Sequence, residues 1–332
     1  MRVWLFFVML CLSCGALAES RTNLIIDTDP GADDMIALLV AFASPDKLNL
    51  LGVTTVAGNV RIDKTSRNAR IAREWASRGD VPIYSGVARP LVRSPVYAES
   101  VHGPEGISGV KVFEPKQPLA GDDAVSFIIT TLRAAPAHSI TLALLGPETN
   151  LALALKQAPD VVKGIKEVVV MGGAHFQGGN VTPTAEFNMF ADAEAAKYVL
   201  DSGVQITYLP IDVTHKLLTS EGRISALDQL GNQAGHHVAS ILRGYIQSYV
   251  ERYGLPGGPV HDATVIAYLL NRELFRGREI YLSIDTREGL TYGQTIADWY
   301  GTLNKKPDAF WVEDGDADEV FKLITSRISK LN

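Results

Sequence analysis

Short apolar segments alternate with longer segments of helical periodicity along the first two thirds of the chain. Residues 24–26, 48–54 and 81–84 form apolar runs, and residues 34–43 and 64–78 between them place apolar side chains at helical spacing. Strand, helix and strand in this order indicate right-handed crossovers in a mostly parallel sheet. The same pattern predicts strands at 140–145, 168–171 and 206–209 and helices at 123–133, 149–157 and 193–200.

The last third of the chain begins with helical patterns and ends with short strands. It predicts capping helices at 234–253 and 263–270, late strands at 279–284, 290–294 and 310–312, and a closing helix at 318–329. Neither a linker nor an internal repeat interrupts this order. The sequence therefore predicts an α/β fold: a single domain with a mostly parallel, Rossmann-like open sheet flanked by helices, and a helical cap near the C-terminal half.

Unusual polar residues gather where the predicted strands end. In open parallel sheets, ligands bind outside the carboxyl ends of the strands, so these segments together outline a candidate site. The strand-end segments are residues 27–34, 54–59, 145–150, 172–188 and 212–215.

Composition narrows the class of protein without changing this picture. The chain has 332 residues, 46% of them hydrophobic, and a formal net charge of -6, which fits one large globular domain. Basic residues form no stripe on any predicted face, so a nucleic-acid partner is not expected.

The N-terminus has the pattern of a secretory signal peptide. Arg2 precedes an apolar stretch over residues 3–12, and small residues end in Ala16–Ala18, which predicts a signal over residues 1–18 and a mature domain over 19–332. We therefore expect export to the periplasm or secretion, without a stable membrane anchor. Cys11 and Cys14 both fall in this segment, so the mature chain is expected to lack cysteine; lipidation at Cys14 is the alternative to cleavage near Ala18.

Four aspartates fall within eight residues directly after the first predicted strand: Asp27, Asp29, Asp33 and Asp34. Carboxylates this close raise one another's pKa values unless a cation or a set of donors neutralises them. Calcium and magnesium take oxygen ligands, and calcium tolerates the irregular geometry that carboxylates on a Pro30-Gly31 turn supply. One Asp at a helix start is ordinarily a cap, but four exceed that need, which favours metal or substrate binding.

Three other segments carry polar residues that the fold does not require. Asn59 ends the segment after the second strand, and an isolated Asn there is equally typical of a turn. Residues 178–188 combine amides, a carboxylate and hydroxyls, a set that suits a polyhydroxylated ligand such as a sugar. His261 and Asp262 open a predicted helix, where the Asp is more often a cap than a ligand.

Taken together, these motifs resemble the nucleoside hydrolases of the inosine-uridine-preferring type. The hallmark of that family is a DxDPGxDD run after the first strand, here residues 27–34, and the matches continue in family order from Asn23 to Ile328. The resemblance implies hydrolysis of the N-glycosidic bond of ribonucleosides, purine and/or pyrimidine, to free base and ribose, in nucleoside catabolism and purine salvage. It also implies a nucleoside as the small-molecule partner and a homo-oligomer, dimer or tetramer.

The resemblance further implies a Ca²⁺ ion held by Asp29, Asp34, Asp262 and one main-chain carbonyl. That carbonyl belongs to Leu145, where the family usually has Thr before Gly-Pro; because the ligand atom is a backbone oxygen, Leu should serve. Asp29 would also be the base for a calcium-bound water, whose pKa the metal lowers.

The ribose contacts are implied by the same resemblance. It assigns Asp33, Asn59, Asn180, Glu186 and Asn188 to the ribose hydroxyls or to the support of Asp29. Glycosidic cleavage passes through an oxocarbenium-like state, so carboxylates and amide oxygens around the ribose stabilise charge that develops in the transition state.

Two histidines match family positions near the base. His261 matches the His that faces the leaving base, and His102 matches a second His near the pocket. A His half-titrated near neutrality can protonate a departing base, although either residue could instead have a structural role. Tyr245, Tyr249 and Tyr253 lie on a helix expected near the base, without assigned positions.

A second class of function stays open at this point: a non-catalytic, calcium-dependent nucleoside- or ribose-binding protein. Asp29, Asn59, Asn188 and His261 favour turnover, because a pure binder needs neither a water-activating base nor a leaving-group acid. The loop at 174–179 is one residue longer than in familiar family members, which bears on the fit around the sugar or base.

Overall fold

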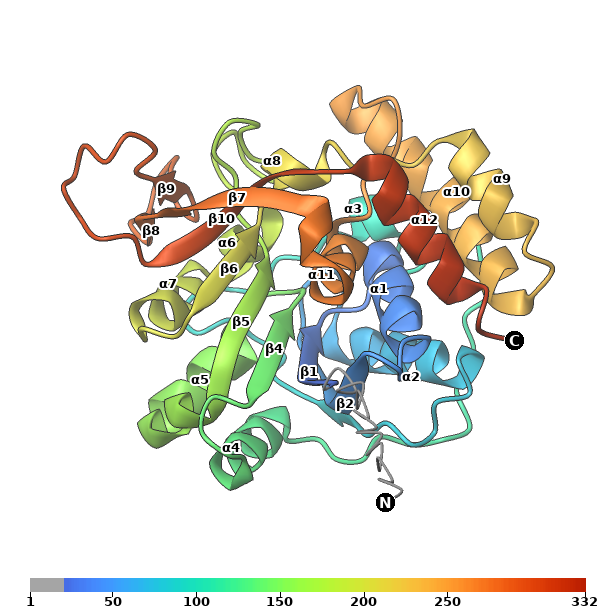
Figure 1. Cartoon of the computed structure of the whole chain (residues 1–332), viewed down its shortest axis with the longest axis horizontal. Helices are drawn as coiled ribbons and strands as arrows, with labels where there is room; N and C mark the ends of the chain where they lie inside the picture. Colours follow the sequence, from blue (N-terminus) through green and yellow to red (C-terminus); the bar gives the residue numbers. More distant parts are fainter. Residues whose placement is uncertain (1–20) are drawn as a thin grey trace, which may run out of the picture.

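The computed structural model describes residues 21–332, so the predicted signal peptide, residues 1–18, lies outside the described part. Eight strands form one open sheet in the order β3-β2-β1-β4-β5-β6-β10-β7, and only β7 is antiparallel to its neighbour (Figure 1). The strands are β1 (Thr22–Thr28), β2 (Leu48–Thr55), β3 (Ile83–Ser85), β4 (Ile140–Leu144), β5 (Ile165–Met171), β6 (Ile206–Leu209), β7 (Phe275–Ile280) and β10 (Ala309–Gly315).

Helices cover both faces of the sheet, each over its own apolar core (Figure 1). One layer contains α1 (Ala32–Phe42), α2 (Ile62–Trp75), α10 (Gln233–Tyr253), α11 (His261–Leu270) and α12 (Ala317–Ile328). The other layer contains α4 (Ala124–Ala134), α5 (Thr149–Gln157) and α7 (Ala193–Asp201). Because both faces are covered, the central strands are apolar nearly throughout instead of alternating with polar residues. The predicted fold class is confirmed.

Short helices and a small hairpin complete the described chain. They are α3 (Glu99–His102), α6 (Phe187–Ala191), α8 (Ile211–Thr214), α9 (Glu221–Asp228), the 3₁₀ segments Pro159–Gly164 and Arg272–Leu274, and the antiparallel pair β8 (Leu282–Ile284) and β9 (Thr295–Ala297). In the predicted cap, α11 packs against α1 and β5, and α10 packs against α1, α3 and α9.

Two of the predicted late strands are wrong. The predicted strand at 290–294 is a turn, because Gly289 and Gly293 adopt φ values of 134° and 79° and the carboxylate of Asp285 accepts the Thr291 hydroxyl and the Arg287 amide. The predicted strand at 279–284 is divided into β7 and β8. It leaves the main sheet after Ile280, and β8 then pairs with β9.

The order of strands reverses at β1, which lies between β2 and β4. The chain runs outward to β3 on one side and to β6 on the other, so the crossovers leave β1 and β4 in opposite directions. This is the position where open α/β sheets form a ligand crevice at their carboxyl ends. The strand-end segments after β1 and β4 therefore meet at the same place.

Candidate active site

The turn after β1 is organised by the carboxylate of Asp34. Its Oδ2 accepts the backbone amide of Gly31 at 2.9 Å, and its Oδ1 accepts the hydroxyl of Thr28 at 2.5 Å. Asp33 and Asp34 lie in the first turn of α1, where the helix dipole favours negative charge. The helix start thus places two carboxylates next to the end of β1.

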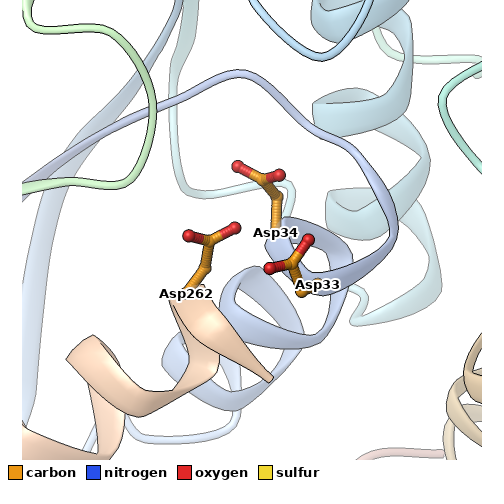
Figure 2. Close-up of side chains that lie close together, drawn as sticks. All are labelled: Asp33, Asp34 and Asp262. Atoms are coloured by element: carbon orange, nitrogen blue, oxygen red, sulfur yellow. The ribbon is translucent and has the colours of Figure 1, made fainter. Parts of the chain in front are cut away.

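A third carboxylate reaches the same point from a distant part of the chain. Figure 2 shows Asp262, from the start of α11, facing Asp33 and Asp34, from the start of α1. Each of these buried side chains offers an oxygen within 4.8 Å of the others. Burial raises the pKa of all three carboxyls, and repulsion from Asp34 raises those of Asp33 and Asp262 further. A cation between them would favour their ionised forms instead.

Asp29 borders this cluster and is completely buried. Its Oδ2 accepts the backbone amide of Asn59 at 2.6 Å, whereas its Oδ1 has no hydrogen-bond partner within residues 21–332. Burial, and then the charge of Asp34, raises its pKa well above the ordinary value. A Cβ atom at Gly58 or Gly146 would lie 2.0 or 2.4 Å from one of its carboxylate oxygens. Glycine at both positions therefore gives the Asp29 carboxylate its room.

These residues fit a hard divalent cation. The three clustered carboxylates and the unpartnered Oδ1 of Asp29 are oxygen donors, as calcium and magnesium require, and no thiol or imidazole belongs to the cluster in the described chain. The carboxylates that lie closest together are not the three that the resemblance assigns to the metal. Asp33, which the resemblance assigns to the ribose, lies in the close group with Asp34 and Asp262, whereas Asp29 lies beside that group and not in it.

Asn59 supports the aspartates with all of its donors. Besides its backbone amide on Asp29, its Nδ2 donates to the carbonyl of Asp29 at 3.1 Å and to Oδ2 of Asp34 at 3.0 Å. Its side chain also lines the cavity described below. The resemblance left two roles open for Asn59: contact with the ribose hydroxyls or support of Asp29. The structure shows the contacts that support Asp29.

The loop between β5 and α6, residues 172–186 (the β5–α6 loop), supplies a second polar wall. The carboxylate of Glu186 caps α6 by accepting the amides of Asn188, Met189 and Gly173 at 2.9 to 3.2 Å, and burial raises its pKa to about 7. Nδ2 of Asn188 donates to the carbonyl of Leu145 at 2.9 Å, which places the predicted carbonyl ligand on the cavity wall.

His102 lies against the start of α1. Its Nδ1 accepts the backbone amide of Ala32 at 3.1 Å, and burial lowers its pKa to about 3. The ring is therefore neutral near pH 7 and carries its proton on Nε2. Nδ1 is also 3.9 Å from Oδ1 of Asp33, and the ring lies 5.5 Å from that of Tyr245. His102 thus presents a hydrogen-bond donor near the acidic cluster.

Both ring nitrogens of His261 are engaged. Nδ1 is 2.6 Å from the hydroxyl of Thr214 on α8, and Nε2 is 2.9 Å from the hydroxyl of Tyr249 on α10. Burial lowers the pKa of His261 well below its ordinary value, so the imidazole is neutral. This differs from the expectation of a half-titrated His, because the site excludes water from the ring. The hydrogen bond to Tyr249 thus joins His261 to α10.

Most of these groups line one cavity of about 280 Å³, close to the lower end of the range for small-molecule sites, ~300 Å³. Asp29 and Asp34 are not among the residues that line it. Every residue predicted from the sequence to bind substrate lines it: Asp33, Asn59, His102, Asn180, Glu186 and Asn188. His261, Asp262 and Leu145 line it as well, and Tyr97, Arg252 and Tyr253 add side chains that sequence reasoning had not placed.

Sequence reasoning missed the partners of the predicted residues. Tyr249 belongs to a row on α10 in which its ring lies 4.8 Å from that of Tyr245 and 5.0 Å from that of Tyr253. The spacing of four residues was visible in the sequence, but not which side of α10 faces the cavity. Thr214 lies in a strand-end segment, 212–215, that the sequence singled out without assigning a role.

The family model described as inosine-uridine preferring nucleoside hydrolase matches residues 24–322 of this chain. The chain belongs to this family. It is 42% identical over 309 residues to an uncharacterized protein of Schizosaccharomyces pombe, covering 93% of this chain and 99% of that protein. It is 40% identical over 286 residues to the pyrimidine-specific ribonucleoside hydrolase RihB of Escherichia coli, covering 86% of this chain and 90% of RihB.

The solved structures agree with the family assignment. The purine-preferring ribonucleoside hydrolase from Gardnerella vaginalis superposes with a TM-score of 0.86 at 29% identity, covering 93% of this chain and 98% of that one. This nucleoside hydrolase is therefore an N-ribosyl hydrolase of nucleoside catabolism, and the family is metal-dependent. The non-catalytic binding protein considered as the alternative is not supported.

Proposed function

We propose that this enzyme hydrolyses ribonucleosides in a calcium-dependent reaction in which water attacks the anomeric carbon and free base leaves. The observation that carries the proposal is the convergence of Asp33, Asp34 and Asp262 beside a cavity that Asp33 and Asp262 line together with amides and two neutral histidines. Oxygen donors for a cation, polar groups for a sugar and a proton donor for a base meet in one enclosed space.

We propose that Ca²⁺ is held by Asp29, Asp34, Asp262 and the carbonyl of Leu145, with Asp33 beside it. Bound there, the ion would lower the pKa of a coordinating water and would hold the ribose diol. The unpartnered Oδ1 of Asp29 supports this assignment, because a buried carboxylate oxygen without a donor costs free energy unless something neutralises it.

Asp29 is proposed as the general base. Asn59 occupies Oδ2 of its carboxylate and leaves Oδ1 without a protein donor, so Oδ1 is the atom that would take the proton of the attacking water. The amide of Asn59 orients the carboxylate, and the glycines at 58 and 146 leave it the space it occupies. The water oxygen then bonds to the ribose carbon as the glycosidic bond breaks.

The ribose is proposed to lie between the acidic cluster and the β5–α6 loop. Asn180 and Glu186 line this wall, and the buried Oδ1 of Asn180 lacks a partner in the described chain. Asn188 also lines the wall. Its side-chain Nδ2 donates to the carbonyls of Leu145 and Met171, so its side-chain oxygen is the atom available for a ribose hydroxyl. The side-chain oxygen of Asn188 would also stabilise the positive charge of an oxocarbenium-like transition state.

The base is proposed to leave toward α10. His261 and Tyr249 share a hydrogen bond there, and either can deliver the proton that balances the charge on the departing base nitrogen. RihB is named pyrimidine-specific and the Gardnerella enzyme purine-preferring, so we propose ribonucleosides of both kinds as substrates to be compared. A place in purine salvage is part of the same proposal.

Export and assembly are proposed from the sequence. The signal over residues 1–18 lies outside the described residues, and export to the periplasm or the medium remains our proposal, as does a homodimer or homotetramer. Within residues 21–332, the helices are too short or too polar to cross a membrane.

The deciding experiment measures release of base from inosine and uridine by protein treated with a chelator. Activity should be lost on chelation and restored by Ca²⁺, and 2′-deoxynucleosides should be cleaved slower by several orders of magnitude, since a site built to pair hydroxyls rejects analogues that lack them. Undiminished activity in a metal-free preparation would refute the role of calcium. Equal rates on the deoxy and ribo substrates would refute the ribose contacts.

A further inference from the structure

Three consecutive backbone amides of the β5–α6 loop converge on one carboxylate. Oδ2 of Asp212 accepts the amide of His175 at 2.9 Å, and Oδ1 accepts those of Phe176 and Gln177, each at 2.8 Å. Asp212 is buried at the start of α8, and Figure 1 shows the loop rising beside that helix. Hydrogen bonds from amides to an ionised carboxylate are among the stronger ones in proteins.

Apolar packing holds this part of the loop only weakly. Phe176 is 62% exposed and Gln177 is exposed, so little surface is removed from water. The rings of His175 and Phe176 contact Trp299 at centroid distances of 5.4 and 4.7 Å, on the outside of the molecule. The hydrogen bonds to the buried carboxylate of Asp212 are therefore the main interactions that fix these three residues.

The next residues of the loop form a compact turn that ends at the cavity. The amide of Gly179 donates to the carbonyl of Pro183, and the hydroxyl of Thr182 accepts the amides of Thr184 and Ala185. Asn180 lies within this turn and lines the cavity, and its Oδ1 is buried and has no hydrogen-bond partner in the described chain. Two contacts hold the turn from outside: the hydroxyl of Tyr253 donates to the carbonyl of Asn180 at 3.0 Å, and that of Thr184 donates to the carbonyl of Leu290 at 2.8 Å. Asp212 holds the three residues that lead into the turn on its N-terminal side.

We propose that Asp212 is a positioning residue that sets the place of Asn180, and so the affinity for the ribose, through the backbone of the β5–α6 loop. The inference rests on the proposed function, since it gives Asn180 a ribose contact. Asp212 touches no reacting atom. It acts through its three amide contacts, and its effect belongs to substrate binding.

Asp212 could also affect the enzyme in a second way, through the position of α8. Thr214, two residues after Asp212, contacts His261, so a displaced α8 would disturb the leaving-group side instead. The two paths differ in kinetics. Loss of a contact made equally in ground and transition states raises KM at constant kcat, whereas loss of leaving-group assistance lowers kcat.

The test compares Asp212→Asn with the parent enzyme on uridine and on p-nitrophenyl riboside. The Asn side chain turns one acceptor into a donor, which opposes an amide of the loop. We expect KM to rise about tenfold on both substrates with kcat within about threefold, since uniform binding is lost. A fall in kcat confined to uridine would overturn the inference in favour of the path through Thr214 and His261.

A double-mutant cycle tests the connection to Asn180. Asn180→Ala should raise KM by itself, and adding Asp212→Asn to it should change KM by less than about twofold, because the contact is already gone. Additive effects would mean that Asp212 acts on something other than Asn180. The matched control is Asp316→Asn, which removes a carboxylate acceptor from the amide of Glu319 at the start of the distant helix α12 and should leave KM unchanged.

Chymotrypsin gives a readout that does not depend on activity. Cleavage after the exposed Phe176 should be at least about fivefold faster in Asp212→Asn than in the parent or in Asp316→Asn, because a loosened loop is open to protease more of the time. Equal cleavage rates would overturn the inference. A parent enzyme that cleaves no nucleoside would refute the proposed function, while the cleavage rates would still decide whether Asp212 holds the loop.

Discussion

Single residues in this site are held by contacts that leave very little freedom. The carboxylate of Asp29 is the best example, because Gly58 and Gly146 approach both of its oxygens and Asn59 bonds one of them. The sequence showed the acidic run, and the family resemblance predicted the role of Asp29. It could not show that Gly146, in an ordinary Gly-Pro turn, is the residue that leaves space for it.

Asp29→Asn should keep the fold and remove most of the turnover. An amide cannot take the proton of the attacking water and is a poorer cation ligand, so kcat should fall by at least about 10²-fold, the low end of general acid-base contributions. Steady-state kinetics with saturating Ca²⁺ measure this. A variant that keeps half of the parent kcat would exclude Asp29 as the base.

Gly146→Ala should damage catalysis without touching any polar group. The added methyl lies 2.4 Å from Oδ1 of Asp29, so the carboxylate must turn away from its place. We expect kcat to fall at least about tenfold, because misplacement by about 1 Å costs up to 10²-fold. Gly222→Ala, at an open position in α9, is the matched control and should retain full activity. An active Gly146→Ala enzyme would show that the position of Asp29 is not critical.

At the scale of elements, the site is made where helices α1, α10 and α11 meet the ends of β1, β4 and β5. The polar pattern after each strand located these segments correctly, since parallel strands end at one edge. The row of tyrosines on α10 could not be placed, because the direction of its side chains depends on how α10 packs against α1. Likewise, the neutral state of His261 depends on burial by α8, α10 and α11 together, which the sequence does not show.

The pairing of α10 with α11 predicts a substrate-dependent defect. His261→Ala and Tyr249→Phe should each lower kcat on inosine far more than on p-nitrophenyl riboside, whose nitrophenolate leaves without a proton. Both changes break the hydrogen bond between His261 and Tyr249. The kcat of the double variant on inosine should therefore be only slightly lower than that of the worse single variant. Equal losses on both substrates would assign these residues to the ribose or to Asp262, and another group would have to protonate the base.

At the scale of the whole molecule, the free energy of unfolding depends on carboxyls that are buried on folding. Burial raises the pKa of Asp27 from 3.8 to about 7 and that of Glu186 from 4.5 to about 7. The metal-free folded state therefore binds protons more tightly than the unfolded state over this range. The free energy of unfolding that these carboxyls contribute at low pH is then lost as the pH rises through their pKa values in the folded protein.

Thermal unfolding of metal-free protein should show this directly. Tm should fall as pH rises from about 5 to about 7.5, and the increase in Tm on adding Ca²⁺ should grow over the same range, because the ion favours ionised Asp34 and Asp262. Exposed carboxylates with lowered pKa values, such as Asp80 and Asp123, titrate below this window. Burial lowers the pKa of His102 to about 3 and that of His215 to about 4, so these histidines oppose the fall in Tm up to about pH 6.5, and the fall should be steepest above that pH. If the increase in Tm on adding Ca²⁺ did not depend on pH, the prediction would be contradicted.

The meeting of Asp33 and Asp34 with Asp262 also bears on how the enzyme is made. These residues stand near opposite ends of the polypeptide, so no fragment released early in synthesis contains the complete acidic cluster. Closing that long separation is a late and slow event in chain collapse. A cation held by all three carboxylates would therefore bind only after α11 has packed against α1, and the ions present at that stage would decide which metal the enzyme acquires.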